Sequence, residues 1–263
     1  MKRVILSLLA ATAMSGAAIA ADLPSRRAAP AYIPPVFTWT GFYAGVNAGY
    51  AFNGDNKMKD LNFNGYYADN FATTSKSDDG SFTGGAQVGY NYQMGSFVIG
   101  AEADFNFIDL KRESTSNDYY AGSYGYGYGL AYDELRGQSK VEWFGTVRAR
   151  VGFTPVDRLL VFVTGGLAYG SVKTTASYEN YSTGYGLYGS KRDTQVGWTV
   201  GAGAEYAITN NLTVKGEYAY VDLGDKRRTW TDGYYGYNSY GNVLSTKTST
   251  DFHVVRAGLN YKF

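Results

Sequence analysis

The stretch Phe97-Val-Ile-Gly-Ala-Glu-Ala-Asp-Phe-Asn-Phe107 alternates between two kinds of side chain. Phe, Ile and Ala fill all of its odd-numbered positions, whereas Glu102, Asp104 and Asn106 lie at even-numbered positions. Because successive residues of a β-strand point to opposite faces, the stretch predicts a strand with one apolar, partly aromatic face and one charged face.

The same period of two recurs in seven other segments. They are Phe42–Phe52, Phe82–Tyr92, Val141–Phe153, Leu159–Tyr169, Val196–Ile208, Leu212–Tyr220 and Val255–Phe263. The alternation is least clean in Leu159–Tyr169, where Leu160 and Phe162 make the second face partly apolar. Segments of about ten residues have the length of tilted strands that cross a bilayer.

The connections between these segments are of two lengths. Residues 93–96, 154–158 and 209–211 form short turns, whereas residues 53–80, 108–140, 170–195 and 221–250 form long connections. Short turns at one end and long loops at the other are typical of outer-membrane barrels. In lipid the sheet has to close, because an open edge would leave backbone N–H and C=O groups unpaired.

The sequence therefore predicts an all-β protein: an eight-stranded antiparallel up-and-down transmembrane β-barrel with short periplasmic turns and four long extracellular loops. The alternative is a soluble eight-stranded barrel, which would carry apolar side chains inside and charges outside. The chain shows the reverse pattern, since ionisable residues share a face with Gly, Asn and Thr, opposite the aromatic residues.

The N-terminus has the pattern of an export signal. Lys2-Arg3 is followed by a short apolar run and by the small-residue cleavage pattern Ala18-Ile19-Ala20. Localisation in the cell outer membrane of a Gram-negative bacterium is therefore expected after cleavage. The predicted domains are a signal peptide at residues 1–20, a Pro-containing periplasmic linker at 21–38 and the barrel at 39–263.

The composition excludes several classes of protein. The chain has 263 residues, a net charge of +1, no Cys and a single His, His253. A near-neutral charge gives no reason to expect a nucleic-acid partner, and the absence of Cys excludes disulfide and zinc–thiolate frameworks. The sequence lacks the G-x-S-x-G and calcium-loop motifs, so we expect no enzyme activity, no bound metal and no resident cofactor.

Four segments resemble a known family: Trp39–Tyr50, Trp143–Gly152, Val161–Tyr169 and Arg256–Phe263. They are similar to the small outer-membrane β-barrel (opacity-type, porin-like) family, especially its alpha-proteobacterial surface-antigen branch. The resemblance covers essentially the whole chain after the signal peptide. It implies an eight-stranded barrel with both termini in the periplasm. Members are described as structural surface proteins, antigens, haem binders or pores, so the resemblance alone does not decide the function.

The end of the chain predicts one partner. Apolar residues alternate up to a terminal aromatic residue, at positions Val255, Ala257, Leu259, Tyr261 and Phe263. This pattern resembles the signal that the barrel assembly machinery reads during biogenesis. The other expected partners are outer-membrane lipid and lipopolysaccharide. The basic cluster Lys226–Arg228 is expected to lie solvated at the rim of the last loop, with contacts to lipopolysaccharide phosphates as the alternative.

The polar faces predict a charged lumen. Its expected ionisable residues are Glu102, Asp104, Glu142, Arg148, Arg150, Glu205, Lys215, Glu217 and Arg256. Counted from the short turns, Glu102, Arg148 and Glu217 lie at one level, and Arg150, Glu205 and Lys215 at another. Paired charges avoid the cost of isolated burial, so we expect a lumen filled by salt bridges.

Three functions remain open from the sequence. The first is a structural, surface-exposed barrel with a side-chain-filled lumen. A narrow porin that passes small solutes or ions is the second. The third is a receptor for haem or host surface molecules, because Tyr beside Gly and Ser forms adaptable binding surfaces and tyrosinate can ligate haem iron. The candidate loop residues for such binding are Tyr124, Tyr126, Tyr128, Tyr185, Tyr234 and Tyr235.

Overall fold

The computed structural model describes residues 37–53, 59–64, 72–77, 80–124, 127–181, 184–231 and 243–263. The expected signal peptide and residues 21–36 of the expected linker lie outside this part of the chain. Within the described ranges, no helix is long and apolar enough to cross a membrane.

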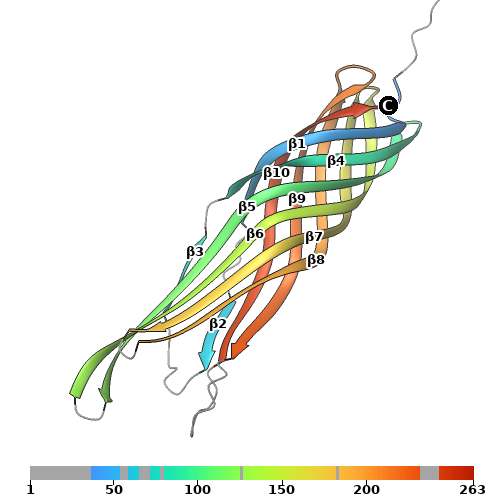
Figure 1. Cartoon of the computed structure of the whole chain (residues 1–263). Helices are drawn as coiled ribbons and strands as arrows, with labels where there is room; N and C mark the ends of the chain where they lie inside the picture. Colours follow the sequence, from blue (N-terminus) through green and yellow to red (C-terminus); the bar gives the residue numbers. More distant parts are fainter. Residues whose placement is uncertain are drawn as a thin grey trace, which may run out of the picture. The chain divides into compact units, whose positions relative to one another are not determined.

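In the described part of the chain, ten strands form one antiparallel sheet that closes on itself (Figure 1). They are β1 (Gly41–Asn53), β2 (Lys59–Asn64), β3 (Ala72–Ser77), β4 (Ser81–Met94), β5 (Phe97–Tyr124), β6 (Gly127–Val156), β7 (Leu159–Asn180), β8 (Tyr185–Ala207), β9 (Leu212–Thr231) and β10 (Val243–Lys262). The first strand closes the ring, because Ala48 lies opposite Gly84 of β4 on one side and Ala257 of β10 on the other.

The predicted eight-stranded up-and-down barrel is confirmed. Its strands are β1 and β4 to β10, each paired with its neighbours in chain order. The three short turns lie where the sequence predicts them. In the turn between β4 and β5, Gly95 has φ = +61°, a left-handed conformation that glycine adopts without the steric cost of a Cβ atom.

The four long connections differ from the expectation, because most of their described residues are strand. The strands β5 and β6 continue as a hairpin as far as the pair Tyr124 and Gly127. The first connection contributes two short strands of its own, β2 paired with β10 and β3 paired with β5. Alternation of apolar and polar residues did not predict these extensions. They lie beyond the lipid layer, so their outer face does not have to be apolar.

Beyond the ring the sheet divides into two arms (Figure 1). Pairing between β8 and β9 ends at Trp198 and Asp222, whereas β8 stays paired with β7, and β9 with β10, far beyond that point. The register between β9 and β10 shifts between Asp222 and Asp225. Gly224, within this shift, has φ = +78°, and its N–H donates to Asp222 Oδ1 at 2.7 Å. Side chains hold the arms together, since Arg228 of β9 donates to Asp193 of β8.

The outer face of the ring is apolar and ends in aromatic residues on both sides. Near the short turns the exposed rings are Phe42, Tyr92, Phe97, Phe153 and Phe263, and near the long connections they are Tyr50, Phe82, Phe107 and Trp198. Between them lie exposed aliphatic side chains such as Val151 and Val163. An apolar band flanked by two aromatic girdles is the surface that a bilayer requires.

Candidate functional site

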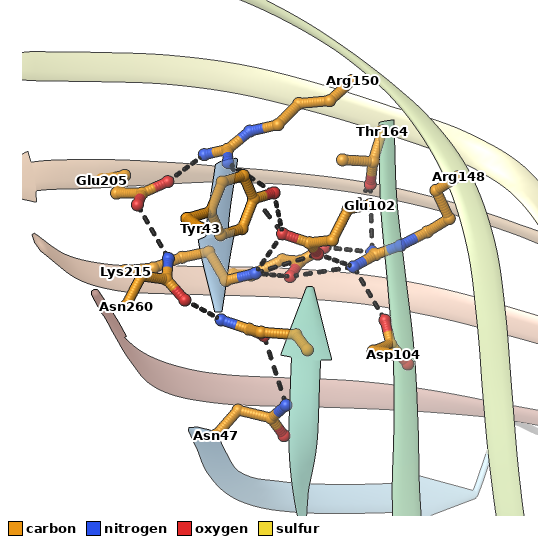
Figure 2. Close-up of polar contacts among 12 residues, drawn as sticks. Tyr43, Asn47, Glu102, Asp104, Arg148, Arg150, Thr164, Glu205, Lys215 and Asn260 are labelled. Atoms are coloured by element: carbon orange, nitrogen blue, oxygen red, sulfur yellow. Dashed lines mark hydrogen bonds and ion pairs between the residues drawn. The ribbon is translucent and has the colours of Figure 1, made fainter. Parts of the chain in front are cut away.

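The lumen of the ring holds eight of the nine charged side chains that the alternation predicts there. Each of the eight exposes 4% or less of its surface. They are Glu102 and Asp104 on β5, Arg148 and Arg150 on β6, Glu205 on β8, Lys215 and Glu217 on β9, and Arg256 on β10. Figure 2 shows several of these side chains converging from different strands.

Arg148 is the centre of this network. Its Nη2 donates to Glu102 Oε1 at 2.5 Å and to Asp104 Oδ2 at 3.1 Å, and its Nη1 donates to Glu217 Oε1. Three carboxylates from two strands therefore share one guanidinium. The planar fork of arginine suits this role, because it offers several donors in fixed directions.

Glu102 collects further donors. Lys215 Nζ lies 3.0 and 2.9 Å from its two carboxylate oxygens, and the Tyr43 hydroxyl of β1 donates to Oε2 at 2.7 Å. The alternation pattern placed Tyr43 on the polar face of its strand, but no charge or motif marked it as a member of the network.

The network closes around the ring through β10. Arg256 Nη2 lies 2.9 Å from Asp104 Oδ2 and 3.0 Å from Glu217 Oε2. On the short-turn side, Arg150 pairs with Glu205, and the Arg150 guanidinium lies 3.8 Å from the centre of the Phe162 ring. Asn260 donates to Glu205 Oε1 at 2.8 Å, which links this pair to β10.

The eight charges balance, with four carboxylates against four cations. Burial of a charge costs several kcal/mol unless ion pairs and hydrogen bonds compensate it. Every carboxylate of the eight has at least one cationic partner. The arrangement is therefore a compensated, water-excluding network.

Apolar side chains close the lumen on both sides of the network. On the short-turn side, Val98, Leu160, Phe162 and Ala207 pack with Trp39, whose indole N–H donates to the Asp157 carbonyl at 3.0 Å. The mixed character of the Leu159–Tyr169 strand thus has a structural reason. On the loop side lies a second cluster, formed by Ala51, Ile108, Leu110, Val141, Phe144, Ala168, Val172, Val221, Leu223, Phe252 and Val254.

Glu142 is not part of the lumen, and this prediction is wrong. The register between β6 and β7 shifts between Val141 and Trp143, so the alternation is interrupted by an extra residue. Val141 is consequently buried inside, although strict alternation places it outside. Glu142 instead accepts a 2.9 Å bond from Arg192, whose side chain is 61% exposed.

Other buried charges lie in the strand extensions, beyond the segments that the sequence pattern marked. Arg112 of β5 pairs with Asp251 of β10, and Arg228 of β9 lies 3.1 Å from Asp193 and donates to Thr174 at 2.7 Å. Arg228 exposes only 6% of its surface, which corrects the expectation of a fully solvated Lys226–Arg228 cluster. Lys226 and Arg227 are exposed as expected.

Only some of the tyrosines expected to bind ligands lie among the described residues. Tyr126, Tyr234 and Tyr235 lie outside the described residues. Near the end of the β5–β6 hairpin, Tyr124 lies opposite Gly127 and Tyr128 lies opposite Ser123. Tyr185 is the first residue of β8.

At the β7–β8 end, two of the described tyrosines have exposed side chains. Tyr188 and Tyr181 are 68% and 57% exposed. Hydrogen bonds to the Glu179 and Glu134 carboxylates raise the pKa of Tyr181 to about 12. This upward shift disfavours the tyrosinate form that ligates haem iron.

The single histidine lies at the aromatic girdle. The ring of His253 stacks on Phe52 at 5.2 Å, and its Nδ1 lies 2.6 Å from the Tyr218 hydroxyl. Among the described residues there is no group of three or more side chains that could hold a metal ion.

The alternating C-terminal residues point outward, and Val255, Leu259, Tyr261 and Phe263 are all exposed. The Phe263 N–H donates to the Phe42 carbonyl at 3.0 Å, which joins the end of the chain to β1. The described part of the chain begins at Phe37, whose ring packs edge-on against Trp39 at 5.0 Å. Both ends of the described barrel thus lie at the short-turn side.

Comparison with known proteins identifies the family. A family model for an outer membrane protein β-barrel domain matches residues 6–263. The chain belongs to the outer-membrane β-barrel family. This outer-membrane barrel is similar to the 31 kDa outer-membrane immunogenic protein of Brucella melitensis, with 41% identity over the whole of both chains.

Two further similarities were found, one to a protein sequence and one to a solved structure. A 22 kDa outer membrane protein of Rhizobium leguminosarum is 30% identical to the barrel over 74% of this chain and 69% of its own. The crystal structure of OprG from Pseudomonas aeruginosa aligns with 88% of this chain and 99% of its own, at 12% identity and a TM-score of 0.49. Family membership confirms the resemblance seen in the sequence and the outer-membrane location of a Gram-negative surface protein.

Proposed function

We propose that this outer-membrane barrel is a structural, surface-exposed component of the membrane whose lumen does not conduct. The observation that carries this proposal is the sealed cross-section. Eight compensated charges fill the middle of the lumen, and an apolar cluster lies on each side of them. An ion would have to cross two apolar layers and displace a paired charge, which opposes permeation.

The narrow-porin alternative requires the network to open as a gate. Glu102→Gln tests this, because it removes one charge at the centre of the network and nearly preserves the volume. We expect planar-bilayer recordings of the refolded full chain and of Glu102→Gln to show no discrete conductance steps. The apolar clusters remain intact in this variant.

The matched control is Glu142→Gln, the same chemical change outside the lumen. Folding of each variant is checked by the change in its electrophoretic mobility on heating. Steps in Glu102→Gln but not in Glu142→Gln would support the gated pore, and steps in the unaltered protein would contradict a closed lumen outright.

The receptor alternative, for haem or host surface molecules, would act through the loops rather than the lumen. Nothing in the described tyrosines favours it over a general surface role. Assembly through the C-terminal pattern and contact with outer-membrane lipid and lipopolysaccharide belong to the proposed structural role. That role needs no cofactor and no catalytic residue.

A further inference from the structure

Four cations form a row on the outer face of the strand extensions. Lys111 of β5 lies opposite Lys140 of β6, Lys140 lies opposite Lys173 of β7, and Lys173 lies opposite Arg192 of β8. Directly opposite residues of antiparallel strands have Cβ atoms about 5 Å apart, and like charges in such positions destabilise a sheet. This cationic row therefore calls for a compensating anion.

All four side chains point away from the lumen. Residues on the other face of these strands, such as Leu110, Ser139 and Val172, are buried inside. The row itself is accessible, since Lys111, Lys140 and Arg192 expose 44%, 31% and 61% of their side chains.

Carboxylates of the protein compensate the row only in part. Asp109 lies 3.0 Å from Lys140 and 3.6 Å from Lys111, and Glu142 lies 2.9 Å from Arg192. Among the described residues no carboxylate lies within ion-pair distance of Lys173. The next row away from the ring contains one further carboxylate in four residues: Glu113, Gln138, Thr175 and Ser190.

The depth of the row indicates which anion is near. On β7 the row follows four residues after Tyr169, and on β8 it lies four residues beyond Val196, the last exposed aliphatic residue of that strand. Four residues of a tilted strand advance about 10 Å along the membrane normal. This distance places the cations just outside the hydrocarbon layer, at the polar headgroups, and lysine side chains can bend back toward them.

We infer that the cationic row formed by Lys111, Lys140, Lys173 and Arg192 binds the phosphate groups of an outer-leaflet lipid. Ammonium and guanidinium groups form strong, charge-assisted hydrogen bonds with phosphate. The lipid chains would lie along the apolar band below the row. This inference rests on the proposed membrane role and assigns residues to its contact with lipid, and it does not depend on a closed lumen.

Native mass spectrometry of the full chain in detergent tests it, with diphosphoryl lipid A as the probe. The test variant is Lys140→Gln/Lys173→Gln. Lys226→Gln/Arg227→Gln is the matched control, because it also removes two exposed cations but lies on the other arm, on β9. A cation near a membrane surface contributes about 1 kcal/mol, so we expect the test variant to bind about 30-fold more weakly and the control to bind as the unaltered protein does.

Two further binding measurements identify the source of the phosphate. Lipid A without phosphate groups is expected to bind the unaltered protein as weakly as diphosphoryl lipid A binds the test variant. Inorganic phosphate at matched concentration is expected not to displace the lipid. Equal weakening in both variants, equal binding of the phosphate-free lipid, or displacement by inorganic phosphate would each overturn the inference.

Discussion

Replacement of Arg148 by methionine is expected to lower the free energy of unfolding of the barrel by about 3–5 kcal/mol. The substitution leaves Glu102, Asp104 and Glu217 without their shared guanidinium. The three remaining cations, Arg150, Lys215 and Arg256, are then too few to neutralise these carboxylates and Glu205. Removal of one partner from a buried ion pair has an effect of this size because a buried charge is left uncompensated.

Urea-induced unfolding in lipid vesicles, followed by Trp fluorescence, measures the effect. Arg192→Met is the matched control, since Arg192 also pairs with a carboxylate but is 61% exposed. We expect the control to change the free energy by less than about 1 kcal/mol. Equal effects of the two substitutions would show that burial of the network does not stabilise the fold.

The second large effect is expected from Gly89→Val. A Cβ atom at Gly89 would lie 2.4 Å from the Tyr43 hydroxyl and 2.7 Å from the Ala101 carbonyl oxygen. The larger side chain must push Tyr43 away from Glu102, so strain and the loss of a charged hydrogen bond add up to about 3 kcal/mol.

Gly216→Val is the control for this prediction. It introduces the same side chain on the outer face of β9, where a Cβ atom would meet nothing within 4 Å. We expect its free energy of unfolding to stay within about 0.5 kcal/mol of the unaltered protein, measured in the same vesicles. If Gly89→Val is equally tolerated, Tyr43 does not occupy the lumen as described.

The charged lumen also has a consequence for strand register. Glu102 lies directly opposite Arg148, and Glu205 lies directly opposite Lys215. A slip of one residue would turn each of these charges toward lipid. An ionic lumen is thus a strong selector of register, although well-packed apolar residues often stabilise an interior equally well.

The alternation pattern was sufficient to find the ring and most of its lumen, because lipid imposes apolar side chains on one face of every spanning strand. Counting residues from the short turns also predicted that Glu102, Arg148 and Glu217 lie at one level of the lumen, and these side chains meet in the structure. Lys215 was expected at the level of Arg150 and Glu205, but its side chain reaches Glu102 instead of Glu205, which lies opposite it on β8.

The failures have physical causes. Glu142 was misplaced because a β-bulge changes the parity of β6 there, whereas Val141 and Trp143 are both apolar and therefore fit an unbroken alternation. Arg112, Asp193 and Asp251 escaped notice because the strands continue beyond the membrane, where both faces can be polar. Trp39 gave a family signal, but its position as a lid over the lumen depends on contacts with turns distant in sequence.

The central claim is that the apolar face of each strand meets lipid while the polar face lines a lumen closed to water. Spin labels test it directly, because the chain has no Cys and single Cys substitutions are therefore unique. Labels at Ile99, Ala103 and Phe105 face lipid, and labels at the uncharged positions Asn106 and Thr146 face the lumen. In vesicles we predict that the outer labels collide with oxygen dissolved in the lipid and not with a water-soluble nickel complex, whereas the lumen labels collide with neither. Frequent collision of the nickel complex with the lumen labels, or with the outer ones, would contradict the account.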